Sequence, residues 1–189
     1  MRLPYVVNGV GVVLRSIELA DAERCVNWLH NPETTRYLLR QYNDLTLETE
    51  IEWIKRVIAS DTDLVAAICV LGSDGVLRHV GNVGIHQIDR VNGHAEIGIF
   101  IGDQLDYGKG VGREALRAII THAFRPIEQN GVGLARVWAR VCKPNKRSRR
   151  MCMHLNLKLE GVLRSHVLHP TEGRLDECLY GILASEWND

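Results

Sequence analysis

The order of strand-like and helix-like segments within residues 78–124 restricts the fold more than any other feature of this sequence. Two alternating segments, "HVGNVGIHQI" and "HAEIGIFIG", are joined through Asn92-Gly93. An Asn-Gly pair between two strands is the strongest short signal for a β-hairpin. A glycine-rich loop at 108–112 follows, and apolar residues then recur at helical spacing. This order predicts a mixed α/β sheet rather than a doubly wound parallel one.

The flanking segments extend this pattern. We expect Asp21 to N-cap a first helix and Thr46 to N-cap a second one. The buried stripe of the second helix is predicted to be Leu47, Ile51, Ile54 and Ile58. "VVLRSI", "LVAAICVL" and "ARVWARVC" read as strands, a short helix begins at Lys146, and "VLRSHVLH" with "ECLYGILA" forms a terminal hairpin. The length of 189 residues suits a single domain over 1–189.

Composition excludes several classes of protein. The 23 basic and 23 acidic residues give no net charge, so nothing global steers the chain toward nucleic acid or an anionic membrane. The five cysteines lack CxxC spacing and read as reduced core thiols, and no metal site is predicted. The sequence has no signal-peptide pattern and no apolar run near the ~20 residues that span a bilayer. We therefore expect a soluble cytoplasmic protein.

The glycine loop has two interpretations. Few Cβ atoms before a helix N-terminus bring backbone N–H groups close to a phosphate, whereas the simpler alternative is a flexible turn. The loop is not a Walker A sequence, because Lys109 is followed by Gly110 where Ser or Thr should stand. It is not GxGxxG either, because its glycines alternate. The mononucleotide-binding fold with a Walker A loop and the dinucleotide-binding fold with a GxGxxG loop are therefore both disfavoured.

At this point the sequence resembles the GNAT superfamily of acyl-CoA N-acyltransferases. "AEIGIFIGDQLDYGKGVGREAL" is similar to the family's central strand, pyrophosphate loop and following helix, and "NKRSRRMCMHLNLKLEGVLRSH" is similar to its next helix and strand. "CLYGILASEW" resembles the branch that acetylates ribosomal-protein N-termini. Two positions depart from the family pattern: Tyr107 replaces the Arg or Gln that opens the loop, and Asn156-Leu157 replaces Gly-Phe. The first departure puts a side-chain clamp on the phosphates in doubt.

The resemblance implies a fold and a cosubstrate. It implies a mostly antiparallel sheet of about seven strands, splayed between strands 4 and 5 and flanked by about four helices. The cosubstrate would be acetyl-CoA, and Pro144 stops the strand where its pantetheine arm would enter. The residues that the resemblance assigns to it are Ile99, Phe100 and Ile101 for the pantetheine arm, and Gly108, Lys109, Gly110, Val111, Gly112 and Arg113 for the pyrophosphate. It also counts Asn145, at the start of the next helix, among the cosubstrate-binding residues.

The basic run "KPNKRSRR" at 143–150 has three interpretations. Positive charge in the first turn of a helix opposes the helix dipole, which an anionic ligand such as coenzyme A would offset. A solvated basic face is the simpler alternative. An RNA-binding module is the non-enzymatic alternative for the whole protein, but no aromatic interleaving accompanies the cluster. We rank the nucleic-acid interpretation below the other two.

Acetyl transfer to an amine needs a proton acceptor, because amines are protonated at neutral pH. Glu96 is the predicted base, since it is the only ionised residue in "AEIGIFI", where burial would raise the pKa of its carboxyl group. If Asn92-Gly93 forms a two-residue turn, Asp89 lies opposite Glu96 and adds to that effect. The alternative is a strand-end glutamate in solvent or paired with Arg90. His86 is the secondary candidate.

On the leaving-group side, Ser148 matches the position that the ribosomal branch is thought to use for the thiol of coenzyme A. Asn145, three residues earlier, could equally be an ordinary N-cap. Cys142 is the one cysteine considered as a covalent nucleophile, and no histidine stands beside it in the sequence to activate it. We therefore expect direct transfer through a ternary complex.

The acceptor amine stays open at this stage. Resemblance favours a protein N-terminal α-amine, while a polyamine or a nucleotide-linked amino-sugar is the alternative. The candidate acceptor-binding residues are Tyr37, Tyr42, His86 and His166. A homodimer is one of the assemblies that the sequence leaves open.

Overall fold

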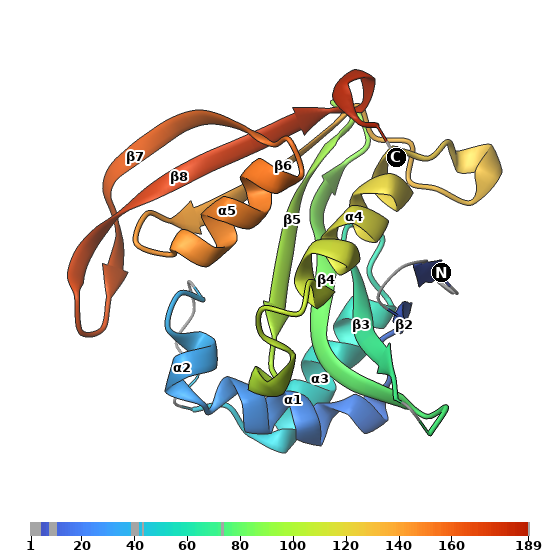
Figure 1. Cartoon of the computed structure of the whole chain (residues 1–189), viewed down its shortest axis with the longest axis vertical. Helices are drawn as coiled ribbons and strands as arrows, with labels where there is room; N and C mark the ends of the chain where they lie inside the picture. The colour runs from blue at the N-terminus through green and yellow to red at the C-terminus, as the bar shows by residue number, and fades with distance from the viewer. Residues whose placement is uncertain (1–4, 8–10, 39–41, 43, 73, 189) are drawn as a thin grey trace. The chain divides into compact units, whose positions relative to one another are not determined.

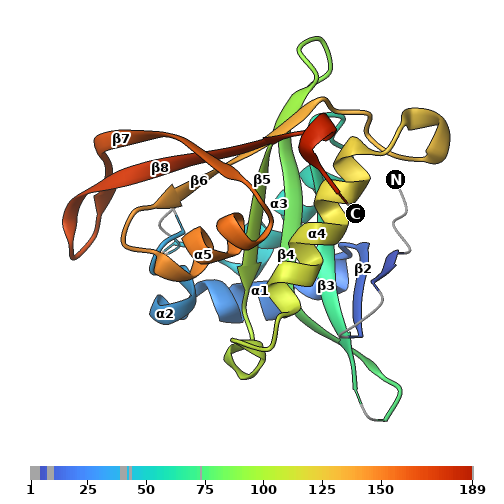
Figure 2. The same ribbon diagram turned by 45° about the horizontal axis from the view of Figure 1, so that its top comes forward.

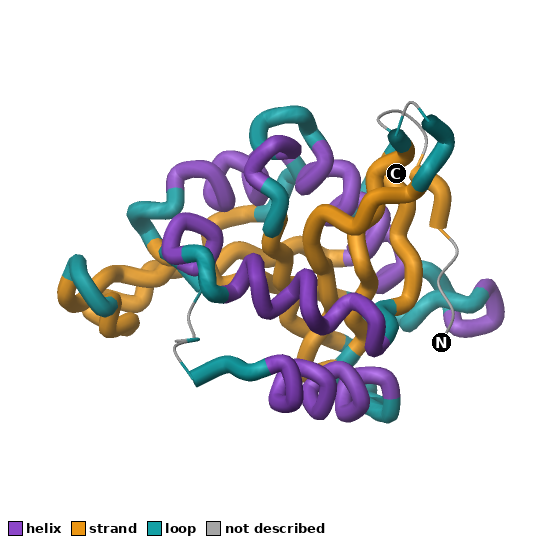
Figure 3. The backbone as a smooth tube through the Cα atoms, turned by 90° about the horizontal axis from the view of Figure 1, so that it is seen from below, coloured by secondary structure: helices purple, strands orange, loops and turns teal. Residues whose placement is uncertain are grey.

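The computed structural model describes residues 5–7, 11–38, 42, 44–72 and 74–188; Figures 1 and 3 draw the others in grey. The strands are β1 (Tyr5–Val7), β2 (Val12–Ser16), β3 (Leu64–Leu71), β4 (Leu77–Asp89), β5 (His94–Ile101), β6 (Arg136–Cys142), β7 (Lys158–His169) and β8 (Gly173–Leu183). The α-helices are α1 (Ala22–Leu29), α2 (Pro32–Thr35), α3 (Leu47–Ile58), α4 (Val111–Phe124) and α5 (Lys146–His154). Short 3-10 helices are η1 (Leu19–Asp21), η2 (Gln104–Asp106), η3 (Ile127–Gln129) and η4 (Ala184–Glu186).

Within the described residues the strands form one sheet in the order β1-β2-β3-β4-β5-β6-β8-β7. β5 and β6 run parallel, whereas β1–β2, β2–β3, β3–β4, β6–β8 and β7–β8 are antiparallel. The predicted mixed, mostly antiparallel sheet is confirmed. It has one strand more than the seven predicted because β1 adds three residues at the edge, and the four-residue α2 is the additional helix.

The parallel pair is short. His94–Glu96 of β5 pairs with Arg136–Trp138 of β6, which are strands 4 and 5 of the predicted count. From Ala139 to Cys142 the register partners of β6 lie on β8. β6 ends at Cys142, two residues before Pro144, as the missing N–H of proline requires.

The chain divides into two compact units, each described by itself. The first unit holds Met1–Gln87 and Gly98–Ile119, and the second holds Ile88–Ile97 and Ile120–Asp189. β4, β5 and α4 each contribute residues to both units. The first unit contains the glycine loop, and the second contains Glu96, α5 and the β7–β8 hairpin.

The start of α1 corrects one prediction in the first unit. Asp21 occupies the N-cap position of α1, as predicted, but its carboxylate makes no cap hydrogen bond to that helix. It accepts instead from Arg15 Nη1 and Nη2 at 2.7 and 2.6 Å, and His79 Nδ1 lies 3.1 Å from it. The buried carboxylate binds these groups because a guanidinium offers it a bidentate, charge-assisted contact that a single cap N–H cannot match.

α3 is capped as predicted, but its buried stripe is shifted. Thr46 Oγ1 accepts a hydrogen bond from the Thr49 N–H at 3.3 Å. Ile54 is fully buried with Ile17, Ala22 and Val65, and the partly buried residues packed against this core are Ile51, Trp53 and Val57. Leu47 and Ile58, at the two ends of the predicted stripe, are exposed. The buried positions of the helix are instead Glu50 and Ile54, one turn apart.

The second unit is built on β6, β8 and β7 with α5 beside them, as both ribbon views show (Figures 1 and 2). Side chains alternate across a strand, and the register pairs Glu96 with Trp138 and Cys142 with Glu177. One face therefore carries Glu96, Arg140 and Glu177, and we name it the Arg140 face. The other face carries buried apolar residues: Val137, Val141, Cys178 and Ile182, together with Tyr180, whose hydroxyl accepts from Arg149 of α5.

Candidate active site

The glycine loop holds its backbone open. Gly108 has a φ of +78° and Gly110 one of +85°, both in the left-handed region where side chains are strained. Among the described atoms, a Cβ at Gly108 would meet nothing within 4 Å, and one at Gly110 would meet only Arg113 Nη2, at 3.9 Å. A ligand could therefore approach the backbone at both positions.

Helix α4 begins directly after this loop. The N–H of Glu114 bonds the Gly110 carbonyl at 3.1 Å, which closes the first turn. The preceding N–H groups, those of Val111, Gly112 and Arg113, have no carbonyl acceptor in the described part of the chain. Unpaired N–H groups at the positive end of a helix bind phosphate oxygens. The residues present thus fit the pyrophosphate of coenzyme A.

Ion pairs anchor the entry to the loop. Arg78 of β4 donates from Nη2 to Asp106 at 2.8 Å and from Nη1 to Asp103. Asp106 is buried, and Lys109 Nζ lies 3.8 Å from its other oxygen. The Tyr107 hydroxyl donates to the Ile101 carbonyl at 3.0 Å. The tyrosine that departs from the family pattern therefore ties the loop to the end of β5.

Ile99, Phe100 and Ile101 are half-buried in β5. A Cβ at Gly81 would lie 2.3 Å from the Phe100 carbonyl oxygen, so this carbonyl faces β4. Backbone groups alternate in direction along a strand, which turns those of Ile99 and Ile101 to the opposite side. Their contact with a pantetheine arm stays a prediction.

Glu96 is paired, and its partner is Arg140 instead of Arg90. Arg140 Nε and Nη2 donate to the two carboxylate oxygens, each at 3.0 Å, and the Glu96 side chain is 14% exposed. The hydrogen bond from Arg140 to Glu96 raises the pKa of the guanidinium. Each oxygen keeps a further lone pair, but a proton on Glu96 would remove the negative charge that the guanidinium pairs with. Its role as base stays a prediction.

The predicted two-residue turn before Glu96 is wrong. β4 ends at Asp89 and β5 begins at His94, so the loop spans four residues, and the Gly93 N–H donates to the Asp89 carbonyl at 2.8 Å. The Asp89 carboxylate accepts from the N–H groups of Val91 and Asn92 within that loop. It is thereby held in the loop, and the condition for placing it opposite Glu96 is not met.

Asn145 caps α5 in the ordinary way: its Oδ1 accepts from the Ser148 N–H at 3.1 Å. The basic run is partly neutralised within the second unit, because Lys143 Nζ pairs with Asp176 at 2.8 Å, which raises the pKa of that lysine. Arg149 donates to the Tyr180 hydroxyl at 3.2 Å and to the Lys143 carbonyl. An anionic ligand is therefore not needed to neutralise every positive charge of residues 143–150.

The candidate acceptor residues lie in both units. Tyr37 follows α2 with the Arg36 guanidinium over its ring, 5.1 Å from the centroid, and the Tyr42 carbonyl accepts from the Leu45 N–H. His86 Nδ1 lies 3.1 Å from Asp63 Oδ1. A Cβ at Gly98 would lie 3.6 Å from the His86 ring, so Gly98 packs against a side chain. The fourth candidate, His166, is half-exposed and faces Glu177.

Sequence reasoning missed Glu177, Arg140 and Arg78. Glu177 was detectable, because an acid inside the apolar strand segment "ECLYGILA" is the same signal that singled out Glu96. Cys142, the register partner of Glu177, is buried, and this burial together with the charge of Glu177 raises the pKa of its thiol. A thiol held protonated is a poor nucleophile.

Two further searches cover the described residues only. Residues 5–7, 11–38, 42, 44–72 and 74–188 contain no group of three or more His, Cys, Asp or Glu residues arranged to hold a metal ion. No helix in the same part of the chain is long and apolar enough to cross a membrane. All five cysteines are buried and unpaired with one another, as predicted.

Comparison with known proteins identifies the family. The model of the acetyltransferase (GNAT) domain family matches residues 12–158. An uncharacterized N-acetyltransferase p20 of Bacillus licheniformis is 28% identical over 191 residues, which cover 93% of this chain and 94% of that protein. The putative ribosomal N-acetyltransferase YdaF of Bacillus subtilis strain 168 is 28% identical over 182 residues, 93% of each chain.

A solved structure shares the fold. Spermidine N-acetyltransferase from Vibrio cholerae, in complex with CoA and spermine, superposes with a TM-score of 0.81 at 19% identity, covering 94% of this chain and 98% of that one. The family match extends over most of the chain, including β2 through α5. The chain therefore belongs to the GNAT acetyltransferase family and is an acyl-CoA-dependent acetyltransferase.

Proposed function

We propose that this protein transfers the acetyl group of acetyl-CoA directly to a primary amine, and that the acceptor is a protein N-terminal α-amine or a small amine. The observation that carries the proposal is the open glycine loop, whose backbone leads into three N–H groups of α4 that have no carbonyl acceptor among the described residues. A phosphate group is the ligand that such a site suits best. The family match makes coenzyme A the phosphate-bearing cosubstrate.

Two relatives support different acceptors. The Bacillus subtilis relative is named a putative ribosomal N-acetyltransferase, which favours a protein N-terminus. The Vibrio cholerae structure contains spermine, which favours a polyamine, although at 19% identity it supports the fold alone. We rank the α-amine first because its reference pKa of about 7.7 to 8.0 leaves far more of it unprotonated at neutral pH than the lysine-like amines of a polyamine.

On the cosubstrate side, Gly108–Arg113 would hold the phosphates through backbone N–H groups. Ile99 and Ile101 would meet the pantetheine arm through backbone groups of β5 that point away from β4, whereas the carbonyl of Phe100, the third residue predicted there, faces β4. Asn145 is assigned to the cosubstrate by resemblance. When bound, acetyl-CoA supplies an activated acetyl group and a thiolate of moderate basicity as leaving group. Ser148 is proposed to donate a hydrogen bond to that sulfur, which stabilises its developing charge.

Glu96 is the proton acceptor that the sequence predicts, and Glu96→Gln tests this prediction. General-base catalysis contributes roughly 10²- to 10⁴-fold, so kcat/KM near pH 7 should fall by an amount in that range if Glu96 is the base. Affinity for coenzyme A should not change. A loss of less than about fivefold from pH 6 to 9 would remove Glu96 from this role.

The acceptor is identified by measuring CoA thiol release with two panels. One panel holds peptides with different N-terminal residues, and the other holds spermidine, spermine and amino-sugar nucleotides. Mass spectrometry then locates the acetyl group on the product. We expect α-amine acetylation in the peptide panel. Acetylation confined to the side-chain or small-molecule amines would contradict the ranking, and no amine-dependent release with either panel would contradict the proposed function.

A further inference from the structure

Glu177 of β8 is a buried acid without a hydrogen-bond donor. Its side chain is fully buried, and among the described residues no group donates to either carboxylate oxygen. Buried carboxylates are normally paired, because an uncompensated charge in the interior is costly. A native protein that keeps such a group has a reason outside stability to do so, and functional sites are where these groups gather.

The neighbours of Glu177 on the Arg140 face explain why it lacks a donor. Arg140 is near enough to influence Glu177 electrostatically, but it directs Nε and Nη2 to Glu96. The strand partner of Glu177 on β6 is Cys142, whose thiol is a weak donor. On β7, His166 lies beside Glu177, with Nε2 3.6 Å from Glu177 Oε2.

A β-bulge directs His166 toward this carboxylate. The register of β7 with β8 shifts between Leu163 and Val167, and Ser165 within that interval has a φ of +53°. The strained turn is held from both sides, because the Ser165 N–H donates to Asp176 at 3.0 Å and Arg174 donates to the Ser165 carbonyl at 3.3 Å. Bulges that re-aim a side chain occur next to active sites.

The resulting pair has one buried and one accessible member. The His166 side chain is 50% exposed, whereas that of Glu177 is 0% exposed. A half-exposed imidazole backed by a buried carboxylate is the arrangement in which the carboxylate orients the ring and stabilises its protonated form, while the outer nitrogen meets the substrate. At 3.6 Å the separation of Nε2 and Oε2 is longer than a normal hydrogen bond.

We propose that His166 is the proton acceptor for the amine substrate and that Glu177 is the residue that positions it. This assignment rests on the proposed function and names the base of that same reaction. The acceptor arrives as an ammonium ion, R–NH₃⁺. Nδ1 of His166 takes one proton, which leaves R–NH₂ and an imidazolium whose Nε2–H points at Glu177. The amine nitrogen then forms the bond to the acetyl carbon as the carbon–sulfur bond breaks. The second proton goes to the released thiolate, and the imidazolium returns its proton to water.

The two earlier candidates are less suitable by geometry. Both oxygens of Glu96 are already held by Arg140. His86 is bonded through Nδ1 to Asp63, and its Nε2 lies so close to Gly84 that a Cβ there would be 2.6 Å away. The outer nitrogen of His86 is thus packed against backbone. His166 combines an exposed ring with a buried carboxylate that no described group donates to.

Burial raises the pKa of the Glu177 carboxyl and the charge of Glu96 adds to this effect, while Arg140 and His166 oppose it. Its ionised form is therefore less stable in the folded chain than in the unfolded one. The destabilisation of the folded chain by ionised Glu177 therefore grows as pH rises from the carboxyl pKa in the unfolded chain, about 4.3, through its higher pKa in the folded chain. Glu177→Gln should consequently fold, with a melting temperature at pH 7.5 no lower than that of the wild type. This makes it a usable test variant.

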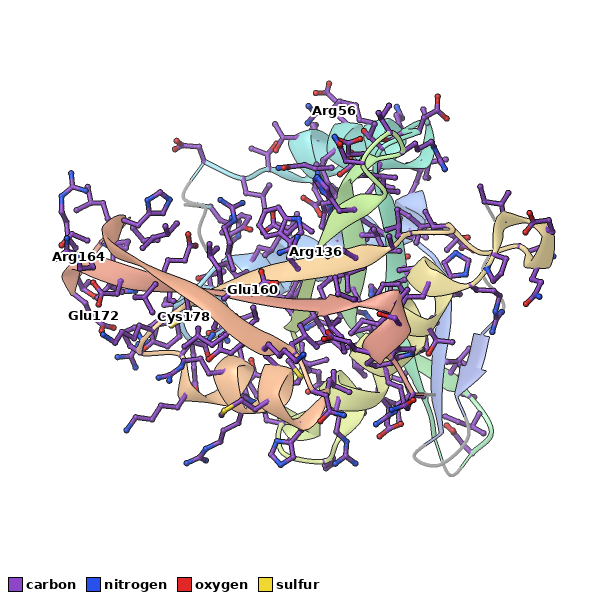
Figure 4. The ribbon with its side chains drawn as sticks, turned by 90° about the horizontal axis from the view of Figure 1, so that it is seen from above. Arg56, Arg136, Glu160, Arg164, Glu172 and Cys178 are labelled. Atoms are coloured by element: carbon purple, nitrogen blue, oxygen red, sulfur yellow. The ribbon has the colours of Figure 1, made fainter. Side chains whose placement is uncertain are left out.

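The test measures kcat/KM for the best amine acceptor from pH 6 to 9. The variants are His166→Ala, Glu177→Gln, their double variant, Glu96→Gln and His86→Gln. Glu160→Gln is the matched control. Glu160 is on the same strand as His166 and pairs with Arg136, toward which it points in Figure 4, and neither proposal assigns it a role.

We expect His166→Ala to lose at least about a hundredfold near pH 7, with partial recovery on adding imidazole, and Glu177→Gln to lose at least about tenfold. The double variant should be no more than about threefold below His166→Ala, because residues that act as a unit are not additive. The acidic limb of the profile in Glu177→Gln should move to lower pH, since a negative charge beside an imidazole favours its protonated form. Glu160→Gln should match the wild type.

Single variants of His166 and Glu177 that stay within about threefold of the wild type would overturn the assignment. Additive losses, or failure of imidazole to restore any activity, would reduce the pair to a structural contact and overturn it as well. These outcomes differ from failure of the proposed function, in which the wild type itself shows no amine-dependent release of CoA.

Discussion

Replacing Gly110 by alanine should weaken coenzyme A binding without unfolding the protein. At φ +85° an L-residue carries left-handed backbone strain of about 1–2 kcal/mol. A Cβ there meets only Arg113 Nη2 at 3.9 Å, so steric overlap adds nothing in the unliganded chain. If the loop of the unliganded variant relaxes to a less strained conformation, it must return to the original one to bind coenzyme A, and binding then costs that same amount, about 1–2 kcal/mol. Because 1.4 kcal/mol corresponds to a factor of ten, the affinity for coenzyme A falls by roughly 5- to 30-fold. Gly110→Val, with a larger side chain over the backbone, should abolish detectable binding.

Gly75 provides the control for strain alone. Its φ is +77°, and a Cβ would meet no described atom within 4 Å. It lies in the loop between β3 and β4, with no assigned ligand. Gly75→Ala should lose a similar 1–2 kcal/mol of unfolding free energy and keep wild-type affinity. Calorimetric titration with CoA measures binding, and urea unfolding measures stability. Gly110→Ala and Gly110→Val that bind CoA within twofold of the wild type would refute the phosphate-cradle reasoning.

Two further predictions concern stability and mechanism. Burial raises the pKa of Asp21, but hydrogen bonds from Arg15 and His79 outweigh this and hold it well below its ordinary value. Its stabilisation is therefore fully present above about pH 3.9 and is lost progressively as pH falls from there through the folded pKa. Asp21→Asn should lose about 1.5–3 kcal/mol at pH 7 and a smaller amount at pH 3 in urea unfolding; an equal gap at both pH values would contradict this. Cys142→Ala should keep most acetyltransferase activity, and an acetylated Cys142 peptide trapped from the wild type would show that the transfer is covalent instead.

Local signals predicted the elements well, and contacts distant in sequence account for what they missed. Thr46 was predicted as a cap because its partner is three residues away. Asp21 has the same local pattern, but a strand residue 58 positions later, His79, and Arg15 bind its carboxylate. The glycine loop could be predicted because the glycines that allow its backbone conformation lie close together in the sequence.

The chemistry of the Arg140 face was harder to predict. Glu96 was found, but its partner Arg140 lies 44 residues away on β6, and no periodicity links the two. The pairing of Glu177 with His166 depends on an irregularity in β7 that shifts the register, and the sequence "VLRSHVLH" gives no sign of where the two extra residues enter. Strand existence could thus be predicted, whereas cross-strand partners could not.

The central claim is that the acetyl group passes directly from acetyl-CoA to an amine on this protein. The most direct measurement follows ¹³C-acetyl-CoA in a single mixture and quantifies free CoA thiol, acetylated amine and acetylated protein together. The account predicts that thiol and acetylated amine appear in equal amounts, only when amine is present, with no acetyl group on the protein. Thiol release that is independent of amine, or an acetyl-protein species that forms without it, would contradict the claim.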